Sequence, residues 1–417
     1  MKRAGTYFLI SLVTVLLSCS KKTSENEVVT SLVPNYGNVD LKNVFTKEDN
    51  QLQDREFTKN VLEDYYSTVW ENGNLSGSIL VAKGDDILLE KYRGFSQDGE
   101  QSPITKETSL HVASVSKTMT AMAVMKLVEA GKVKLSDDLQ TIFPGFPYQG
   151  IQVLHLLNQR SGLPKYEYFI DKISPKPQEL SKEFITNQDV LSLIIKYKPE
   201  LARTTDTGFM YCNTNYALLA LVVEKVTKMP FPKAMQEILF KPLGMKNSYI
   251  FTEKDLATAA RSFYNGGNRL YPYDHLDLIF GDKNVYTTPR DLFNFSKAMF
   301  SADFLKDNLK DMVFEPYSNE KAGVNNYGLG FRMKIYDNGE KLTYHNGWWH
   351  GSNTVFGHLL KSKVTIIALG NKYSTRVYTA LALSGLFENF PIEAEKLAKV
   401  MSKSDSSKLD SAESVGE

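Results

Sequence analysis

Ser114 and Lys117 are the residue types that could form an activated nucleophile. On a helix, side chains three residues apart project about 60° apart and lie within mutual reach. A neutral or partly desolvated lysine can accept the serine proton, and the N-terminal end of a helix favours nearby negative charge. The same spacing occurs at 18–21 and 318–321, and a capping serine beside a solvated lysine is an equally weighted alternative. Only Ser114 opens a run typical of a buried helix, where an idle lysine would be costly.

A second polar group, Tyr211-Cys212-Asn213, stands directly before an apolar run. The Tyr211 phenol could move a proton, and the Asn213 amide could hold a substrate carbonyl and fix Lys117 by hydrogen bonds. Taken alone, these residues are better explained as a core tyrosine and a helix cap. Cys212 is interpreted as packing, because no base is evident near it.

A third group comprises His345, Gly347 and Trp348, expected at the end of a strand. Glycine permits close approach of a ligand to the backbone. The N–H of Trp348 could join that of Ser114 in an oxyanion hole for a tetrahedral intermediate. Taken alone, His345 is more typical of a surface histidine than of a catalytic one.

The remaining histidines predict no metal site and no cofactor, because they lack the spacing of metal ligands. Those considered are His111, His155, His275 and His358.

Hydrophobic periodicity indicates which elements position these groups. Residues 57–70 have helical spacing, and 77–92 reads as an antiparallel hairpin. Residues 113–130 are apolar almost all round a helix, which is typical of a buried one. Further helices are expected at 189–196, 215–228, 232–239, 289–300 and 379–387, and strands at 327–336, 341–344, 353–360 and 364–369.

Strands at both ends of the chain predict an α/β (α+β) fold, with a mainly antiparallel sheet flanked by helices and an inserted all-helical domain. We expect the catalytic cleft at the junction of these two parts. The predicted divisions are a signal peptide at 1–18, a polar tether at 19–54, a catalytic domain at 55–395 and a disordered polar tail at 396–417. Within the catalytic domain, the sheet comes from about 55–110 and 325–395 and the helical insertion from about 111–324.

The N-terminus carries Lys2 and Arg3, then an apolar run at 7–17 that is too short for a mature membrane span. The segment Leu-Leu-Ser-Cys ending at Cys19 resembles the lipobox of bacterial lipoproteins, in which the cysteine is acylated. That resemblance implies an exported protein anchored to a membrane by a lipid on Cys19, facing the periplasm or cell exterior, and Ser20 is compatible with the outer membrane. A plain secretory signal with an incidental cysteine is the alternative.

The composition excludes a role that depends on strong charge. The 417 residues contain 49 Lys and Arg against 48 Asp and Glu, so no basic field attracts nucleic acid. Hydrophobic residues make up 42%, which is enough for a sizeable core.

In order, Ser114-x-x-Lys117, Tyr211-x-Asn213 and His345-x-Gly347 resemble the three active-site motifs of the serine β-lactamase and penicillin-binding protein superfamily, in its class C-like branch. Further segments are similar to signatures of that family: 155–164, 241–245, 281–292 and 327–331. The resemblance covers roughly residues 57 to 390 and implies a β-lactamase/transpeptidase-like fold.

By this resemblance, Ser114 is the nucleophile, Lys117 and Tyr211 are the acid/base pair, and Asn213 contacts the substrate and Lys117. His345 replaces the lysine of the third motif, and Gly347 and Trp348 line the oxyanion side. The Thr-Asp pair at 205–206 and the aromatic residues after Gly347 depart from the family pattern. Because a histidine gives less positive charge than a lysine, β-lactam hydrolysis is disfavoured.

The expected function is therefore that of a serine hydrolase forming a covalent acyl-enzyme on a small ester, amide or peptide. An esterase or a D-amino-acid or cell-wall peptidase ranks above a β-lactamase. The alternative is a non-catalytic, penicillin-binding-like sensor or scaffold for cell-wall ligands, which the aromatic pair Trp348 and Trp349 motivates.

Overall fold

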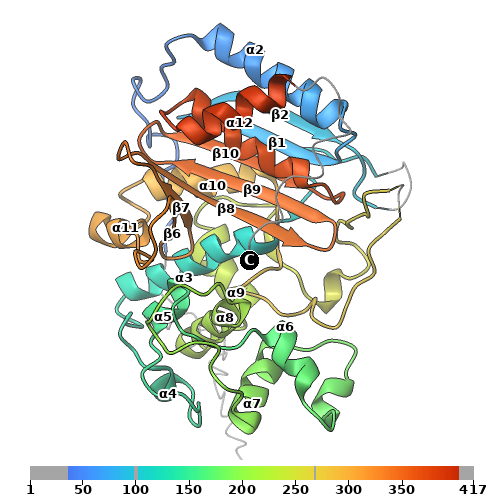
Figure 1. Cartoon of the computed structure of the whole chain (residues 1–417), viewed down its shortest axis with the longest axis vertical. Coiled ribbons are helices and arrows are strands. Elements are labelled where there is room, and N and C mark those ends of the chain that lie inside the picture. Colours follow the sequence, from blue (N-terminus) through green and yellow to red (C-terminus); the bar gives the residue numbers. More distant parts are fainter. Residues whose placement is uncertain (1–35, 98–101, 267–268, 403–417) are drawn as a thin grey trace, which may run out of the picture.

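The computed structural model describes residues 36–97, 102–266 and 269–402. Its centre is an antiparallel sheet with the strand order β2-β1-β10-β9-β8-β7-β6 (Figure 1). The strands are β1 (Gly77–Lys83), β2 (Asp86–Arg93), β6 (Asn325–Tyr327), β7 (Arg332–Ile335), β8 (Lys341–Trp349), β9 (Ser352–Leu359) and β10 (Val364–Gly370). Both ends of the chain thus contribute to one sheet, because β1 pairs with β10 from Gly77 opposite Gly370 to Lys83 opposite Val364.

One face of this sheet is covered by segments from the two ends of the chain. They are α2 (Arg55–Tyr65), its π-helical continuation Tyr66–Glu71, the 3₁₀ helix Thr375–Leu386 and α12 (Pro391–Ser402). Figure 1 shows the blue helix α2 and the red helix α12 lying over the blue and orange strands. Trp70 and Tyr65 are fully buried in the core between these helices and the sheet.

The other face packs on the central part of the chain, which is mainly helical. Its α-helices are α3 (Ser116–Glu129), α4 (Leu139–Ile142), α5 (Val153–Leu157), α6 (Tyr166–Phe169), α7 (Asn187–Tyr197), α8 (Asn213–Thr227), α9 (Phe231–Met235), α10 (Pro289–Phe300) and α11 (Asp307–Val313). Helices α3 and α8 are apolar on nearly every side and are buried in the larger core. A helix that is apolar on nearly every side would expose hydrophobic surface to water if it lay at the surface. Helix α3 accordingly lies between the sheet and the other helices.

A small second sheet joins the segment before α3 to the central part. It has the order β3-β5-β4, with β3 at Leu110–His111, β5 at Val285–Thr287 and β4 at Tyr249–Ile250. It ties the chain just before Ser114 to the chain just after Asn284.

The predicted fold class is confirmed, and several predicted boundaries were wrong. The helix expected from Ala113 begins with a 3₁₀ turn at Ala113–Val115. The strand expected at 327–336 is two strands, β6 and β7, and the last predicted helix, at 379–387, is the 3₁₀ helix Thr375–Leu386. Strand β8 continues to Trp349, so the residues of the third motif lie within it rather than at an earlier strand end.

No helix among the described residues is long and apolar enough to cross a membrane. The signal peptide, Cys19 and residues 403–417 lie outside the described residues. The disordered tail was predicted to begin too early, at 396, because α12 continues to Ser402 and buries Leu397 and Val400. The other domain limits stay predictions.

Gly330 sits where the chain between β6 and β7 passes α3. Its φ is +88°, and a Cβ there would lie 2.5 Å from the Cβ of Ala121 and 3.1 Å from the carbonyl oxygen of Lys117. Gly339 has a similar φ of +81° with no atom within 4 Å of its Cβ position. Alanine substitution would therefore cause backbone strain at both positions but steric overlap only at Gly330.

We predict that Gly339→Ala costs about 1 kcal/mol of unfolding free energy through backbone strain alone. Gly330→Ala adds overlap with α3 and should cost about 3 kcal/mol. Urea denaturation followed by circular dichroism measures both. Equal losses for the two variants would show that α3 does not depend on this close approach.

Candidate active site

The turn that carries Ser114 is held by the sheet. Ala113 adopts a left-handed φ of +47°, which is strained for a residue other than glycine. The hydroxyl of Thr354 on β9 donates a hydrogen bond of 2.8 Å to the carbonyl of Val112. Strand β9 thus fixes the chain immediately before the serine.

Gly347 on β8 makes room for the same turn. A Cβ at this position would lie 2.4 Å from the Val112 carbonyl oxygen and 3.1 Å from the Ala113 Cβ. The sequence predicted that this glycine lets a ligand approach the backbone. In the structure, it is the chain's own serine turn that approaches it.

Lys117 is completely buried at the start of α3. Its Nζ lies 3.0 Å from Ser114 Oγ and donates a 2.9 Å hydrogen bond to the main-chain carbonyl of Asp282. A neutral amine that donates one hydrogen to this carbonyl can direct its lone pair at the serine hydroxyl. The geometry therefore suits removal of the Ser114 proton by Lys117.

Tyr211 lies on the other side of this amine. Its ring centroid is 5.0 Å from Lys117 Nζ and 4.6 Å from the guanidinium carbon of Arg332 on β7. Burial alone would lower the pKa of Arg332, but the neighbouring phenols, Tyr211 first, outweigh it and raise that pKa. Arg332 thus stays charged beside the phenol of Tyr211.

His345 is fully buried within β8. Its Nδ1 lies 2.7 Å from the Asn346 carbonyl, which can only accept, so Nδ1 carries the hydrogen. Nε2 then accepts from the Tyr327 hydroxyl at 3.2 Å. Burial, followed by the charges of Arg332 and Lys117, lowers the pKa of His345 well below its ordinary value. A neutral His345 does not supply the positive charge of a third-motif lysine.

The Asn213 side chain does not hydrogen-bond to Lys117, contrary to the expectation from the sequence. Its amide Nδ2 donates to Glu167 Oε1 on α6, and its Oδ1 has no hydrogen-bond partner. The carbonyl of Asp282 takes the place expected for Asn213 beside the lysine.

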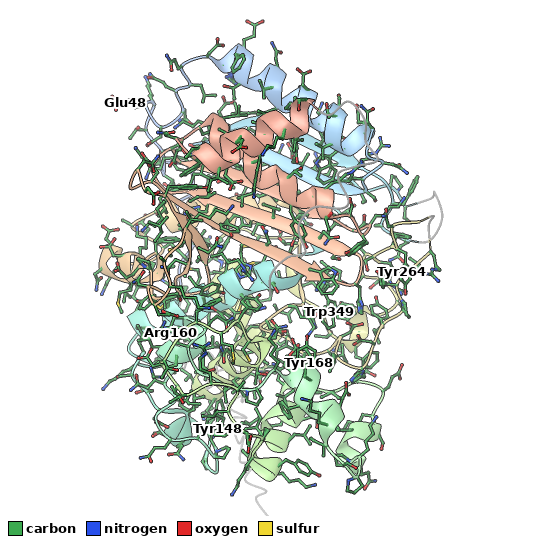
Figure 2. The ribbon with its side chains drawn as sticks, viewed as in Figure 1. Glu48, Tyr148, Arg160, Tyr168, Tyr264 and Trp349 are labelled. Atoms are coloured by element: carbon green, nitrogen blue, oxygen red, sulfur yellow. The ribbon has the colours of Figure 1, made fainter. Side chains whose placement is uncertain are left out.

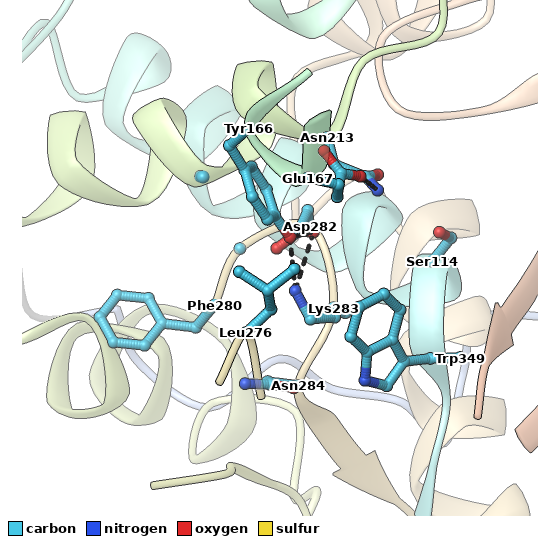
Figure 3. A network of polar contacts seen from close by, with 12 residues as sticks. Ser114, Tyr166, Glu167, Asn213, Leu276, Phe280, Asp282, Lys283, Asn284 and Trp349 are labelled. Atoms are coloured by element: carbon cyan, nitrogen blue, oxygen red, sulfur yellow. Dashed lines mark hydrogen bonds and ion pairs between the residues drawn. The ribbon is translucent and has the colours of Figure 1, made fainter. Parts of the chain in front are cut away.

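A buried ionic group lies beside these residues, as Figure 3 shows. The Tyr166 hydroxyl donates to Asp282 Oδ2 at 2.7 Å and accepts from Lys283 Nζ. Lys283 Nζ also lies 3.4 Å from Asp282 Oδ2 and 4.5 Å from the centroid of the Trp349 ring. Asp282 therefore contacts Lys117 through its main chain and Lys283 through its side chain.

The aromatic end of β8 faces the helical part of the molecule, and Figure 2 shows Trp349 at this position. The Trp349 indole donates to Asp277 Oδ1 at 2.6 Å, and His350 Nε2 lies 2.9 Å from the same oxygen. Burial alone would raise the pKa of Asp277, but the bonds from His350 and Trp349 and the charge of His350 outweigh it and lower that pKa. Trp348 is different, because its side chain is 53% exposed.

Asp274, Asp277 and His350 are the group of described residues whose donor atoms lie close enough, within 4.8 Å, to hold a metal ion. The contacts above already use the atoms of Asp277 and His350. The absence of a metal stays a prediction.

Cys212 is buried, with its thiol 3.3 Å from the Leu163 carbonyl. Burial raises the pKa of this thiol to about 12, so it is a poor nucleophile. This agrees with its interpretation as a packing residue.

Sequence reasoning missed Arg332, Glu167, Asp282 and Lys283. Asp282 and Lys283 offered a signal, since both lie in the segment 281–292 that is similar to a family signature. Glu167 offered none, because a single glutamate in the short aromatic segment Tyr166–Phe169 has no spacing that marks a site.

Comparisons with known proteins agree with this fold. A family model described as beta-lactamase matches residues 59–383. Penicillin-binding protein 4* of Bacillus subtilis (strain 168) is 29% identical over 338 residues, which cover 76% of this chain and 72% of that relative. The crystal structure of a penicillin binding protein from Bacillus halodurans has a TM-score of 0.68 at 26% identity, covering 77% of this chain and 98% of that one.

A more distant likeness is to D-amino acid amidase from Ochrobactrum anthropi SV3 complexed with D-phenylalanine. It has a TM-score of 0.64 at 19% identity, covering 83% of this chain and all of the other. At this identity the likeness shows a shared fold.

Three fully or largely buried histidines predict acid sensitivity. Burial lowers the pKa of His111 and of His358 from 6.5 to about 3 and that of His345 well below 6.5. Below pH 6.5 the unfolded chain gains protons that the folded chain does not, so stability present above pH 6.5 falls by about 1.4 kcal/mol per pH unit for each histidine. Urea denaturation curves recorded between pH 7.5 and pH 5 measure this loss of unfolding free energy.

His358→Gln is the matched variant, because His358 contacts Ser296 and lies away from Ser114. In this variant, the dependence of the unfolding free energy on pH should be smaller by the contribution of one proton. A slope identical to that of the original chain would show that His358 is not held neutral.

Proposed function

This chain belongs to the β-lactamase family, and we propose that it is a serine hydrolase whose nucleophile is Ser114. The observation that carries the proposal is the 3.0 Å contact between Ser114 Oγ and the buried Nζ of Lys117. Burying a lysine beside a serine hydroxyl lowers the stability of the fold unless the lysine is fully paired, and the fold does not need a lysine at this position.

In the proposed reaction, Ser114 Oγ attacks the carbonyl carbon of an ester or amide while Lys117 Nζ takes the hydroxyl proton. The tetrahedral intermediate collapses, and the leaving alcohol or amine receives a proton from the pair formed by Lys117 and Tyr211. Water then attacks the acyl-enzyme and restores Ser114. The Arg332 guanidinium assists by stabilising negative charge on Tyr211 when the phenol has given up its proton.

The backbone N–H groups of Ser114 and Trp348 are proposed as the oxyanion hole. Gly347 supports this role, since the absent side chain lets β8 lie against the turn before Ser114. Such preorganised donors are worth about 3 to 4 kcal/mol in transition-state stabilisation.

For the bond that is cleaved, we favour an ester or an amide such as a D-amino-acid or cell-wall peptide over a β-lactam. His345 is neutral, so it lacks the charge with which a third-motif lysine attracts a carboxylate. This chain is similar to a penicillin-binding protein and to a D-amino acid amidase, and this similarity favours an amide substrate.

A non-catalytic sensor or scaffold for cell-wall ligands is the second candidate. The exposed ring of Trp348 favours it, because an aromatic surface binds ligands without needing chemistry.

Intact-mass spectrometry with a fluorophosphonate, a penicillin and an activated ester tests the nucleophile. We predict an adduct or turnover that Ser114→Ala abolishes and that Lys117→Ala slows by at least about a hundredfold. Ser318→Ala is the matched control, since Ser318 and Lys321 have the same spacing, and it should label normally.

Labelling that persists in Ser114→Ala would contradict the assignment of the nucleophile. A chain that no probe labels, but that binds cell-wall peptides, would be the sensor or scaffold.

We also propose that the protein is exported and anchored to a membrane, in the outer membrane, through a lipid on Cys19. The sequence around Cys19 carries this proposal. Cys19→Ser should move the protein from the membrane pellet to the soluble fraction, as judged by fractionation of cells. A variant that still pellets with the membrane would exclude the lipid anchor.

A further inference from the structure

Glu167 and Asn213 present unused acceptor atoms beside the proposed nucleophile. Glu167 Oε2 and Asn213 Oδ1 have no hydrogen-bond partner, whereas Glu167 Oε1 accepts from Asn213 Nδ2. Both residues are only partly buried, although these two oxygens are shielded from solvent. Figure 3 shows the pair above Asp282 and Lys283, and the main-chain carbonyl of Asp282 links this group to Lys117 and so to Ser114. Buried oxygens without donors are costly, so they indicate a missing ligand group.

The charges around this pair do not balance. Asp282 is matched by Lys283 and by the Tyr166 hydroxyl, whereas the Glu167 carboxyl has neutral partners, the Asn213 amide and its own main-chain N–H. Lys117 must be neutral when it accepts the proton of Ser114, so it cannot serve as the missing cation during acylation. The charged groups that act on Glu167 are then the Asp282 carboxylate and the Lys283 ammonium, whereas the cation Arg332 lies over the Tyr211 ring.

The pKa of Glu167 also indicates that a positively charged partner is missing. Burial is the main cause that raises the pKa of Glu167, and repulsion by Asp282 adds to it; the hydrogen bond from its own main-chain N–H, the charge of Lys283 and the Asn213 bond oppose the rise without cancelling it. A cation at Glu167 Oε2 would reverse this penalty. An ammonium group has three donors and no acceptor, which matches two acceptor oxygens without donors.

We infer that the site takes substrates with a free, positively charged amino group next to the scissile carbonyl, and that Glu167 and Asn213 bind this ammonium. Unblocked amino-acid amides and esters, and peptides with a free N-terminus, are the substrate class. The inference rests on the proposed function, because it places the ammonium beside a carbonyl that Ser114 attacks. Glu167 is then a specificity-determining residue, and the ammonium group of the substrate neutralises its carboxylate.

The test compares matched p-nitroanilides of one amino acid, with the amino group free or acetylated, in both enantiomers. The original chain should prefer the free amine in at least one enantiomer by about a hundredfold in kcat/KM, as expected for a largely desolvated charge pair. In Glu167→Gln this preference should fall to within about tenfold, mainly through loss of activity on the free amine. Glu315→Gln, an exposed glutamate, is the matched control and should keep the preference.

The outcomes separate this inference from the proposed function. If fluorophosphonate labels Ser114 but the original chain hydrolyses free and acetylated substrates equally, the inference is wrong and the serine hydrolase stands. If Glu167→Gln keeps the full preference, another group binds the amine and the inference is equally wrong. If Ser114 is never labelled, the proposed function itself fails.

Binding without turnover gives a second readout. In Ser114→Ala, an unblocked amino-acid amide should raise the unfolding temperature, and its acetylated form should not. The added change Glu167→Gln should remove this response.

Stability at different pH values tests the buried charge directly. A raised pKa means that the folded chain holds the Glu167 proton more tightly, so stability is lost as pH rises from the ordinary value of 4.5 through the raised value. Near pH 7, Glu167→Gln should therefore unfold at a higher temperature than the original chain, and below pH 4.5 the difference should vanish. A Gln variant that is less stable at pH 7 would show that the carboxylate is already satisfied, which contradicts the missing cation.

Discussion

The structure depends most on the burial of one amine, Lys117, against a serine and a main-chain carbonyl. A lysine with no exposed surface is unfavourable unless its donors are used, and here Ser114 Oγ and the Asp282 carbonyl use them. The carbonyl is especially suitable because it accepts a hydrogen whether the amine is charged or neutral. It therefore holds Lys117 in place in both protonation states that acid/base chemistry requires.

The fold brings distant segments to this amine. Strands β8 and β9 come from near the C-terminus, yet they hold the turn before Ser114 through Gly347 and Thr354. The segment before β5 supplies Asp282, while the start of α8 supplies Asn213. A sheet built from both ends of the chain, with helices inserted between them, is what allows such segments to meet. The rigid sheet supports the serine on one side, and the helices supply the remaining polar groups on the other.

What the sequence could predict follows from the range of the interactions. Ser114 and Lys117 are one helical turn apart, so local geometry alone predicts their contact. The strands and the buried helix follow from hydrophobic periodicity, which also depends on near neighbours. The partner of Lys117 is 165 residues away in the chain, and no pattern of spacing identifies a main-chain carbonyl. For the same reason, Asn213 was assigned to Lys117, whereas its actual partner is Glu167.

The treatment of His345 shows how burial changes the meaning of a residue. Its motif position suggested a weaker substitute for a lysine, but a fully buried imidazole between Arg332 and Lys117 cannot readily take a second proton. Because it stays neutral, its two nitrogens have fixed roles toward the Asn346 carbonyl and the Tyr327 hydroxyl. The permanent cation in this region is Arg332, on the neighbouring strand and over the Tyr211 ring. The positive charge in this region therefore lies on β7 beside the Tyr211 phenol and not on the third-motif residue.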